Sequence, residues 1–215
     1  MYRKFVKRFF DVSIALLGLL IFSPLFLIIS IAVKFDSPGP VLFRQKRIKK
    51  DKDFFYILKY RTMKTETPKD LPAHLLSNPD CCVTRVGRIL RRTSLDEIPQ
   101  LFNILSGSMS IVGPRPALYN QFELIEERDK YEANSVQPGL TGWGQVQGRN
   151  EESAEVKASW DGFGVQNMSF LFDAKCFFFT IRKMFHSGVI TDSAKQFGES
   201  LVQYETEAEG SKVNV

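Results

Sequence analysis

The sequence has few of the residues that most often hold metals or cross-link small folds. It contains three cysteines and two histidines among 215 residues. Cys81 and Cys82 are adjacent and Cys176 stands alone, a spacing that suits neither a disulfide framework nor a zinc site. We therefore expect reduced thiols in a cytoplasmic compartment. His74 falls in a proline-rich stretch and is interpreted as a loop residue rather than a catalytic base; the other histidine is His186.

Charge and composition favour a folded protein with an anionic partner. Charged residues make up 25% of the chain and hydrophobic residues 44%, the balance of a globular domain. The net charge is +5 and the pI is about 9.1, so a membrane surface, a nucleic acid or a phosphorylated ligand would be attracted. No nucleic-acid-binding motif accompanies the charge, so no nucleic-acid partner is expected.

Residues 12–33 form an uncharged run of 22 residues. The run is too long for the apolar part of a cleaved signal peptide, and no small-residue cleavage site follows it. As one straight helix it would be roughly 33 Å long, about the thickness of a bilayer core. A transmembrane helix is therefore the default interpretation.

Two features favour a re-entrant hairpin instead, although a proline-kinked span stays open. Ser23-Pro24 stands at the midpoint, where Pro24 removes an amide donor and clashes with the Leu20 carbonyl. The Ser23 hydroxyl can satisfy a carbonyl that this break frees. Basic residues, which prefer the cytoplasmic side, flank both ends. We expect Asp11, at the polar edge, to pair with Arg8 or to cap the dip. The flanking basic residues are Arg3, Lys4, Lys7, Arg8, Lys34, Arg44, Lys46, Arg47, Lys49 and Lys50.

The rest of the sequence predicts a mainly helical cytoplasmic domain with a small β element. The expected elements are strands over 41–48 and 53–63, a surface loop or lid over 64–80, a basic helix over 84–92, a helix over 96–105, a glycine-rich ligand-binding stretch over 137–150 and an aromatic-rich helix over 167–189. Val86, Ile89 and Leu90 should form the apolar face of the basic helix. The aromatic-rich helix fits either a core or a membrane interface. The expected divisions are a membrane segment over 1–35, a catalytic domain over 36–190 and a polar tail over 191–215.

Two adjacent acids, Asp96 and Glu97, follow two arginines in "RRTSLDEIPQLFNIL". Ser94-x-x-Glu97 has the spacing of a helix-capping box. Pro99 is tolerated only in a first turn, so the helix should begin near residue 95 or 96, where its dipole favours negative charge. The pair also suits phosphate chemistry in a positive field. The preceding arginines and the helix start should keep Asp96 ionised despite Glu97 beside it.

Four motifs together resemble the bacterial sugar transferases, the monotopic phosphoglycosyl transferases. They are "LKYRTM", "TSLDEIPQLFNIL", "SGSMSIVGPRP" and "PGLTGWGQVQGRN", and with the basic N-terminus and the Ser-Pro pair the resemblance covers roughly residues 1–190. It implies an α+β, membrane-associated fold with a re-entrant hairpin and interfacial amphipathic helices. It also implies a bacterial inner-membrane enzyme whose catalytic domain lies on the cytoplasmic face.

The resemblance implies a two-step transfer of a phosphosugar. A carboxylate, matching Asp96, attacks the β-phosphate of a nucleotide-diphosphate sugar, expected to be a UDP-sugar, and releases the nucleoside monophosphate. Polyprenol phosphate then takes the phosphosugar from the enzyme. Glu97 matches the acid that serves Mg²⁺ and the electrostatics of the site. The remaining positions expected to bind substrate are Arg91, Arg115, Lys59, Gln145, Arg149, Asn150 and Asp161, with Asp96, Glu97 and Asp161 as metal ligands.

Two positions depart from the family pattern, and one other class of function competes. Gly164 stands where a tyrosine is common, and Ser108 where an aspartate is usual, so sugar or nucleotide contacts are expected to differ here. A non-catalytic membrane adaptor would explain the charge and the hairpin but not the paired acids. The sugar, the prenol, the glycan pathway and the oligomeric state, including a homo-oligomer, stay open.

Overall fold

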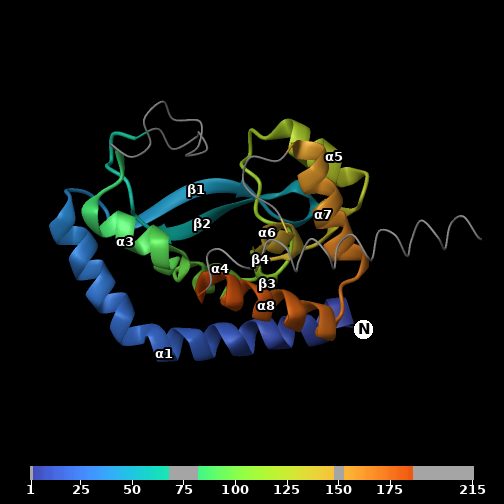
Figure 1. Cartoon of the computed structure of the whole chain (residues 1–215), viewed down its shortest axis with the longest axis horizontal. Coiled ribbons are helices and arrows are strands. Elements are labelled where there is room, and N and C mark those ends of the chain that lie inside the picture. The colour runs from blue at the N-terminus through green and yellow to red at the C-terminus, as the bar shows by residue number, and fades with distance from the viewer. Residues whose placement is uncertain (1, 68–81, 148–152, 186–215) are drawn as a thin grey trace, which may run out of the picture.

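The computed structural model describes residues 2–67, 82–147 and 153–185. One long helix runs beneath a mixed α+β body that holds the remaining helices and two small sheets (Figure 1). The elements are η1 (Tyr2–Val6), α1 (Lys7–Asp36), β1 (Leu42–Ile48), η2 (Lys50–Lys52), β2 (Phe54–Tyr60), α3 (Arg85–Thr93), η4 (Leu95–Glu97), α4 (Gln100–Leu105), β3 (Ser110–Val112), α5 (Phe122–Asp129), η5 (Ala133–Ser135), β4 (Gly139–Thr141), α6 (Trp143–Gln147), α7 (Ala154–Gln166) and α8 (Phe170–Phe185).

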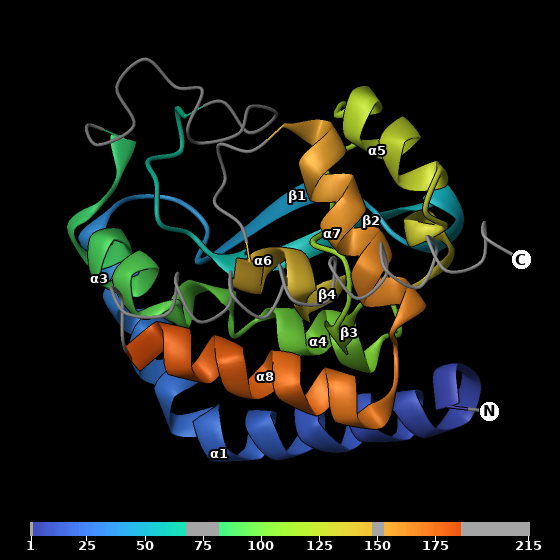
Figure 2. The same cartoon turned by 45° about the vertical axis from the view of Figure 1, so that its right-hand side comes forward.

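Helix α1 is long and apolar enough to cross a membrane, with a mean hydropathy of 2.7 in its most apolar stretch. Pro24 lies inside it, and the ribbon changes direction midway in Figures 1 and 2. The Ser23 hydroxyl donates to the Leu20 carbonyl at 2.8 Å, as predicted for a carbonyl that the proline leaves without its amide donor. The bend is therefore stabilised locally by a side chain.

The first arm of α1 is fixed to the body by a buried ion pair. Lys7 Nζ lies 2.5 Å from Asp173 Oδ2 of α8, and both side chains are 10% exposed. The Tyr2 hydroxyl donates to the same oxygen at 2.6 Å. Figure 2 shows α8 lying along this arm, and the Phe10 and Phe170 rings pack with centroids 4.9 Å apart.

Arg8 and Asp11 complete this attachment, but not as the predicted pair. The Arg8 guanidinium donates to the last two carbonyls of α4, at 2.5 and 2.8 Å, where a cation satisfies free acceptors. The buried Asp11 carboxylate instead accepts from the Ser110 hydroxyl at 3.0 Å and the Ile111 amide at 2.9 Å. We call Lys7, Arg8, Asp11 and Asp173 the N-terminal anchor.

The second arm of α1 contacts the other end of the same body. Ile29 and Val33 pack with Tyr60 and Leu90 in one buried cluster. The buried Arg61 guanidinium donates to main-chain carbonyls at and after the end of α1; its acceptors are the carbonyls of Val33, Ser37, Pro38 and Pro40. Both arms are thus attached to the same body.

The two predicted strands are confirmed as an antiparallel hairpin. β1 and β2 pair from Leu42 opposite Tyr60 to Ile48 opposite Phe54. The other edge of β2 is covered by Asn103 of α4, whose Oδ1 accepts from the Leu58 amide and whose Nδ2 donates to the Tyr56 carbonyl, both at 2.9 Å. A side chain thus takes the place of a neighbouring strand.

The described part of the glycine-rich stretch, residues 137–147, contributes to the core, which corrects the expectation that it is too rich in glycine for a core element. It forms β4, paired in parallel with β3, and α6, whose Trp143 is 6% exposed. A Cβ on Gly139 would lie 2.2 Å from the Gly113 nitrogen, and one on Gly142 would lie 2.0 Å from the Gly113 carbonyl oxygen. The glycines are therefore needed for contact between two segments of main chain rather than with a ligand.

The remaining predictions have mixed outcomes. The basic helix is confirmed as α3, but on its expected apolar face Ile89 is 63% exposed while Leu90 is 3% exposed. The aromatic-rich helix is present as α8, whereas α5 and α7 were not predicted. Most of the expected lid over 64–80, and the tail, lie outside the described residues. Exposed apolar side chains lie along α1 and α8, and we call them the apolar face: Phe9, Leu16, Leu17, Leu20, Ile21, Leu27, Ile28 and Ile31 of α1 and Phe170, Leu171 and Phe178 of α8.

Candidate active site

Asp96 and Glu97 lie in η4, a single 3₁₀ turn between α3 and α4. The predicted continuous helix is wrong because Pro99 has no amide to donate to the Leu95 carbonyl; Ile98 donates to it instead, at 3.4 Å. The predicted capping box is also wrong. Ser94 has a left-handed φ of 56°, ends α3 and makes no side-chain cap. The turn that carries the two acids is therefore defined by a helix end and a proline.

Glu97 is surrounded by cations. Its Oε1 lies 2.5 Å from Lys59 Nζ of β2 and 3.4 Å from Arg115 Nη2 of the Pro-Arg-Pro loop. Burial would raise the pKa of Glu97, but Lys59 and Arg115 outweigh it and lower the pKa to about 2. Glu97 is therefore ionised and its charge is already balanced by neighbouring residues.

Asp96 is in the opposite situation. It forms no ion pair within 4.0 Å with any residue that the structure describes. Burial raises its pKa above the usual value, with a further contribution from Glu97, although Lys59 and Arg91 oppose the shift. Arg91 thus lowers the pKa of Asp96, as predicted, but desolvation raises this pKa by more. Arg91 itself is held by the Thr62 hydroxyl, 3.0 Å from its Nε.

Arg47 is a third cation of this site that the sequence reasoning missed. Its Nε and Nη2 donate to Gln45 Oε1 at 3.0 and 2.6 Å, and its Nη1 donates to the Pro116 carbonyl at 2.8 Å. These acceptors are neutral, and burial together with nearby Arg115 lowers the pKa of Arg47 to about 10. The two-residue spacing of Gln45 and Arg47 on β1 could have indicated one face shared with Lys59.

Asp161 is not brought to the acid pair. Its Oδ2 accepts from Nε and Nη2 of Arg128 at 2.9 and 2.6 Å, and both side chains are 6% exposed. Burial raises the pKa of Asp161 although Arg128 opposes the shift. Among the described residues no three His, Cys, Asp or Glu side chains form a group that could hold a metal ion. The predicted set of Asp96, Glu97 and Asp161 is therefore not assembled.

The other predicted substrate-binding residues give less information. Gln145 lies in α6, where its side-chain Nε2 donates to the Leu140 carbonyl at 3.3 Å. Its main-chain carbonyl accepts from Lys183 Nζ at 2.9 Å. Arg149 and Asn150 lie outside the described residues. The structure thus brings Lys59, Arg115 and Glu97 into contact and places Arg91 within electrostatic range of Asp96.

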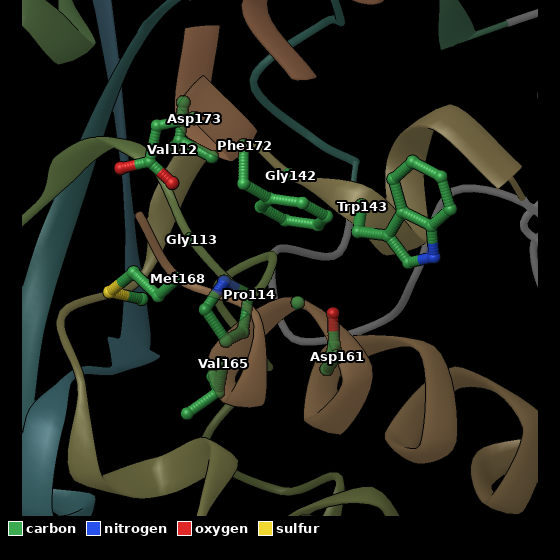
Figure 3. A pocket seen from close by; sticks show the side chains of 11 residues that line it. Val112, Gly113, Pro114, Gly142, Trp143, Asp161, Val165, Met168, Phe172 and Asp173 are labelled. Carbon is green, nitrogen blue, oxygen red and sulfur yellow. The ribbon is translucent and has the colours of Figure 1, made fainter. Parts of the chain in front are cut away.

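A small cavity lies behind the Pro-Arg-Pro loop (Figure 3). It has room for about one water molecule and contains none of the residues that surround Glu97. Gly164, the departure from the family pattern, lines it, and Asp173 Oδ1 is buried there without a hydrogen-bond partner in the structure. The lining residues are Val112, Gly113, Pro114, Gly142, Trp143, Asp161, Gly164, Val165, Met168, Phe172 and Asp173.

Comparison with known proteins agrees with the sequence motifs. The profile described as bacterial sugar transferase matches residues 2–187. The exopolysaccharide production protein ExoY of Sinorhizobium fredii is 41% identical, over 81% of this chain and 83% of its own length. The UDP-glucose:undecaprenyl-phosphate glucose-1-phosphate transferase of Escherichia coli is 41% identical, over 85% of this chain and 40% of its own length.

A third relative is the UDP-N-acetylgalactosamine-undecaprenyl-phosphate N-acetylgalactosaminephosphotransferase of Aeromonas hydrophila. It is 35% identical over 83% of this chain and 43% of its own length. The last two relatives are thus longer proteins that contain a region like this chain. The match of the family profile to nearly the whole described chain establishes that the protein is a phosphoglycosyl transferase of the bacterial sugar transferase family.

Proposed function

We propose that this protein transfers a phosphosugar from a UDP-sugar to polyprenol phosphate through a covalent intermediate on Asp96. The observation that carries the proposal is the contrast between two adjacent acids. Glu97 is neutralised by Lys59 and Arg115, whereas Asp96 is partly buried and forms no ion pair with a residue that the structure describes. A partly desolvated carboxylate that is not engaged in an ion pair is a competent nucleophile toward phosphorus. The names of two relatives support the donor and acceptor classes.

In the first step an Asp96 carboxylate oxygen attacks the β-phosphorus of the donor. A carboxylate–phosphorus bond forms, the bond to the bridging oxygen breaks, and the nucleoside monophosphate leaves with that electron pair. In the second step a phosphate oxygen of the acceptor attacks the same phosphorus. The bond to Asp96 then breaks, and the carboxylate is restored with a polyprenyl-diphosphate sugar as product. Because both nucleophiles are anions, neither step requires a histidine base.

The cations of the site fit the charge of a diphosphate. Lys59 and Arg115 contact Glu97, while Arg47 and Arg91 donate to neutral acceptors nearby, so four cations accompany the two acids and positive charge is available for an anionic ligand. Guanidinium groups bind phosphate oxygens in fixed geometry, and charge on a transferring phosphoryl group needs such groups in the transition state. Lys59 and Arg115 also keep Glu97 ionised.

Magnesium belongs to the same proposal. Its chemistry favours one or two carboxylates together with substrate phosphates rather than a complete protein cage. Asp96 and Glu97 offer oxygen donors of that kind, and Asp161 is engaged by Arg128. When bound, the ion would neutralise charge on the donor phosphates. The residues around it orient the donor and stabilise charge on the departing phosphate.

We further propose that α1 is re-entrant and that the body lies on the cytoplasmic face of the inner membrane. Both arms of α1 contact one body, and this supports the hairpin because a straight span would carry one arm away from that body. The apolar face of α1 and α8 would then be immersed in one leaflet as an interfacial surface.

The function is tested by mixing purified enzyme in detergent with UDP-glucose, Mg²⁺ and no acceptor. We expect release of UMP in an amount equal to the enzyme, together with an intact-mass increase of one hexose phosphate. Polyprenol phosphate added afterwards should remove the adduct and yield the lipid product. If a panel of UDP-sugars gives neither UMP nor an adduct, the proposal is wrong and the adaptor interpretation gains support.

The topology is tested by cysteine accessibility. Arg3→Cys and Pro38→Cys each place a thiol at an exposed position on either side of α1, in a background in which Cys81, Cys82 and Cys176 are replaced. Both thiols should react only when the cytoplasmic side is accessible. Pro24→Ala should shift the segment toward a full span, because the continuous helix no longer has a break. Labelling from opposite sides in the parent sequence would refute the hairpin.

A further inference from the structure

The main chain of the loop that carries Arg115 is held at every carbonyl from Pro114 to Ala117. The Pro114 carbonyl accepts from the Gly139 amide at 2.8 Å and the Ala117 carbonyl from the Ile48 amide at 3.0 Å. The two carbonyls between them accept from arginine side chains, since the buried Arg128 donates from Nη2 to the Arg115 carbonyl at 2.8 Å and Arg47 donates from Nη1 to the Pro116 carbonyl at 2.8 Å.

Two prolines add to this rigidity because their rings fix φ and leave no amide to satisfy. The side chain of Arg115 is 50% exposed, so the loop presents a solvent-accessible guanidinium on an immobilised backbone. Its Nη2 lies 3.4 Å from Glu97 Oε1. A phosphate-binding group gains most when its position is fixed before the substrate arrives.

Arg128 needs a counter-ion to stay in this place. Its side chain is 6% exposed, and Asp161 Oδ2 accepts from both Nε and Nη2. The same Nη2 reaches the Arg115 carbonyl, so the fork of the guanidinium joins α7 to the loop. A lysine could keep the charge pair but could not make the whole set of bonds.

We propose that Arg128 and Asp161 are positioning residues for Arg115. Arg128 fixes the main chain of the Pro-Arg-Pro loop, and Asp161 holds and neutralises Arg128. This inference rests on the proposed function, and it gives Asp161 a role in the fold of the site in place of metal ligation.

The first test measures the rate of adduct formation from UDP-sugar in single turnovers. Arg128→Lys should slow it about 10- to 100-fold, as a displaced phosphate contact does. The double variant Arg128→Met with Asp161→Leu replaces the ion pair by apolar side chains, which avoids leaving one buried charge. It should fold, as near-ultraviolet circular dichroism would verify, and should be slowed to a similar degree.

Coupling to Arg115 distinguishes positioning from general damage. When Arg115→Ala is added to the double variant, the rate should fall less than about twofold below the slower of the two variants that are combined. Both changes remove the same phosphate contact, so their effects should not multiply. The Mg²⁺ concentration for half-maximal rate should be unchanged in Asp161→Asn. Asp129→Asn is the matched control. Asp129 is next to Arg128 in the sequence, and the change breaks its exposed ion pair with Lys52, so this variant should keep the parent rate.

A second readout does not depend on activity. Amide hydrogen exchange over residues 113–118 should accelerate in Arg128→Lys and not in Asp129→Asn. Independent, multiplying losses with Arg115→Ala, a shifted Mg²⁺ dependence in Asp161→Asn, or unchanged exchange in the loop would each overturn the inference. If the parent enzyme forms no adduct but hydrogen exchange in the variants changes as predicted, the result would count against the proposed function alone.

Discussion

The turn that we propose to be catalytic, Leu95–Glu97 with the cations around it (the catalytic turn), and the N-terminal anchor are both clusters of acids and bases, but they differ in how their charges are satisfied. In the anchor, Lys7 is paired with Asp173, and Asp11 accepts two hydrogen bonds from the β3 segment. At the turn, Glu97 is paired with Lys59, whereas Asp96 has no ion pair with a described residue. One cluster is buried and closed; the other keeps an acid and several cations available.

The difference separates charges that hold a fold from charges that await a ligand. A buried ion pair such as Lys7 with Asp173 holds two elements together, and removing one partner leaves an uncompensated charge. A desolvated acid beside unbalanced cations is costly to the fold and useful for chemistry. The sequence does not show this distinction, because Asp11 and Asp96 each follow basic residues.

The largest expected effect is at Asp96. Asp96→Asn should abolish turnover and the phosphosugar adduct, because an amide cannot form the acyl phosphate. Intact mass after mixing with UDP-sugar is the measurement. The variant should melt no lower than the parent, since the pKa of Asp96 is raised and the fold disfavours its ionised form. Accumulation of the adduct in this variant would place the nucleophile elsewhere.

The anchor should show the reverse pattern. Asp173→Asn leaves Lys7 buried without its counter-ion and should cost about 3–5 kcal/mol of stability. The melting temperature in detergent should therefore fall, while the folded fraction still forms the adduct. Lys7→Met combined with Asp173→Leu should recover much of the loss. A fully stable Asp173→Asn would show that the anchor is not a closed charge cluster.

The arginines of the catalytic turn should affect rate more than stability. Arg91→Ala and Arg115→Ala should each cost about 2–4 kcal/mol in the transition state, roughly 30- to 1,000-fold in rate. Single-turnover release of UMP measures the loss. Arg88→Ala, on the same helix as Arg91, is a suitable control. Equal losses in Arg88→Ala and Arg91→Ala would indicate a general effect of surface charge.

The smallest effect is a pH dependence at Glu97. Its pKa is lowered to about 2, so its ionised form stabilises the fold above the ordinary value of 4.5, and this contribution is lost as pH falls toward 2. Glu97→Gln should therefore lower the melting temperature at pH 7 and less so at pH 3. An equal decrease at both pH values would contradict the assignment of charge at Glu97.

Local patterns predicted much of the fold, and long-range contacts limited the rest. The strands over 41–48 and 53–63 were predicted, although their pairing as a hairpin was not, and Ser23-Pro24 predicted both the bend and its compensating hydrogen bond. The partners of Asp11 and Asp161 could not be predicted, because they lie 99 and 33 residues away in the sequence. The glycine-rich stretch was misread because glycines that admit a ligand and glycines that admit another strand have the same pattern.

The amide of Asn103 has a consequence for self-association. A two-stranded hairpin exposes two edges that can recruit strands from other molecules, and Asn103 occupies one of them. Because Asn103 belongs to α4, which follows the catalytic turn, and β2 carries Lys59, the same two bonds also set the distance between the halves of the active site. Protection from aggregation and alignment for catalysis therefore depend on one side chain, so a variant that loses the first should lose the second with it.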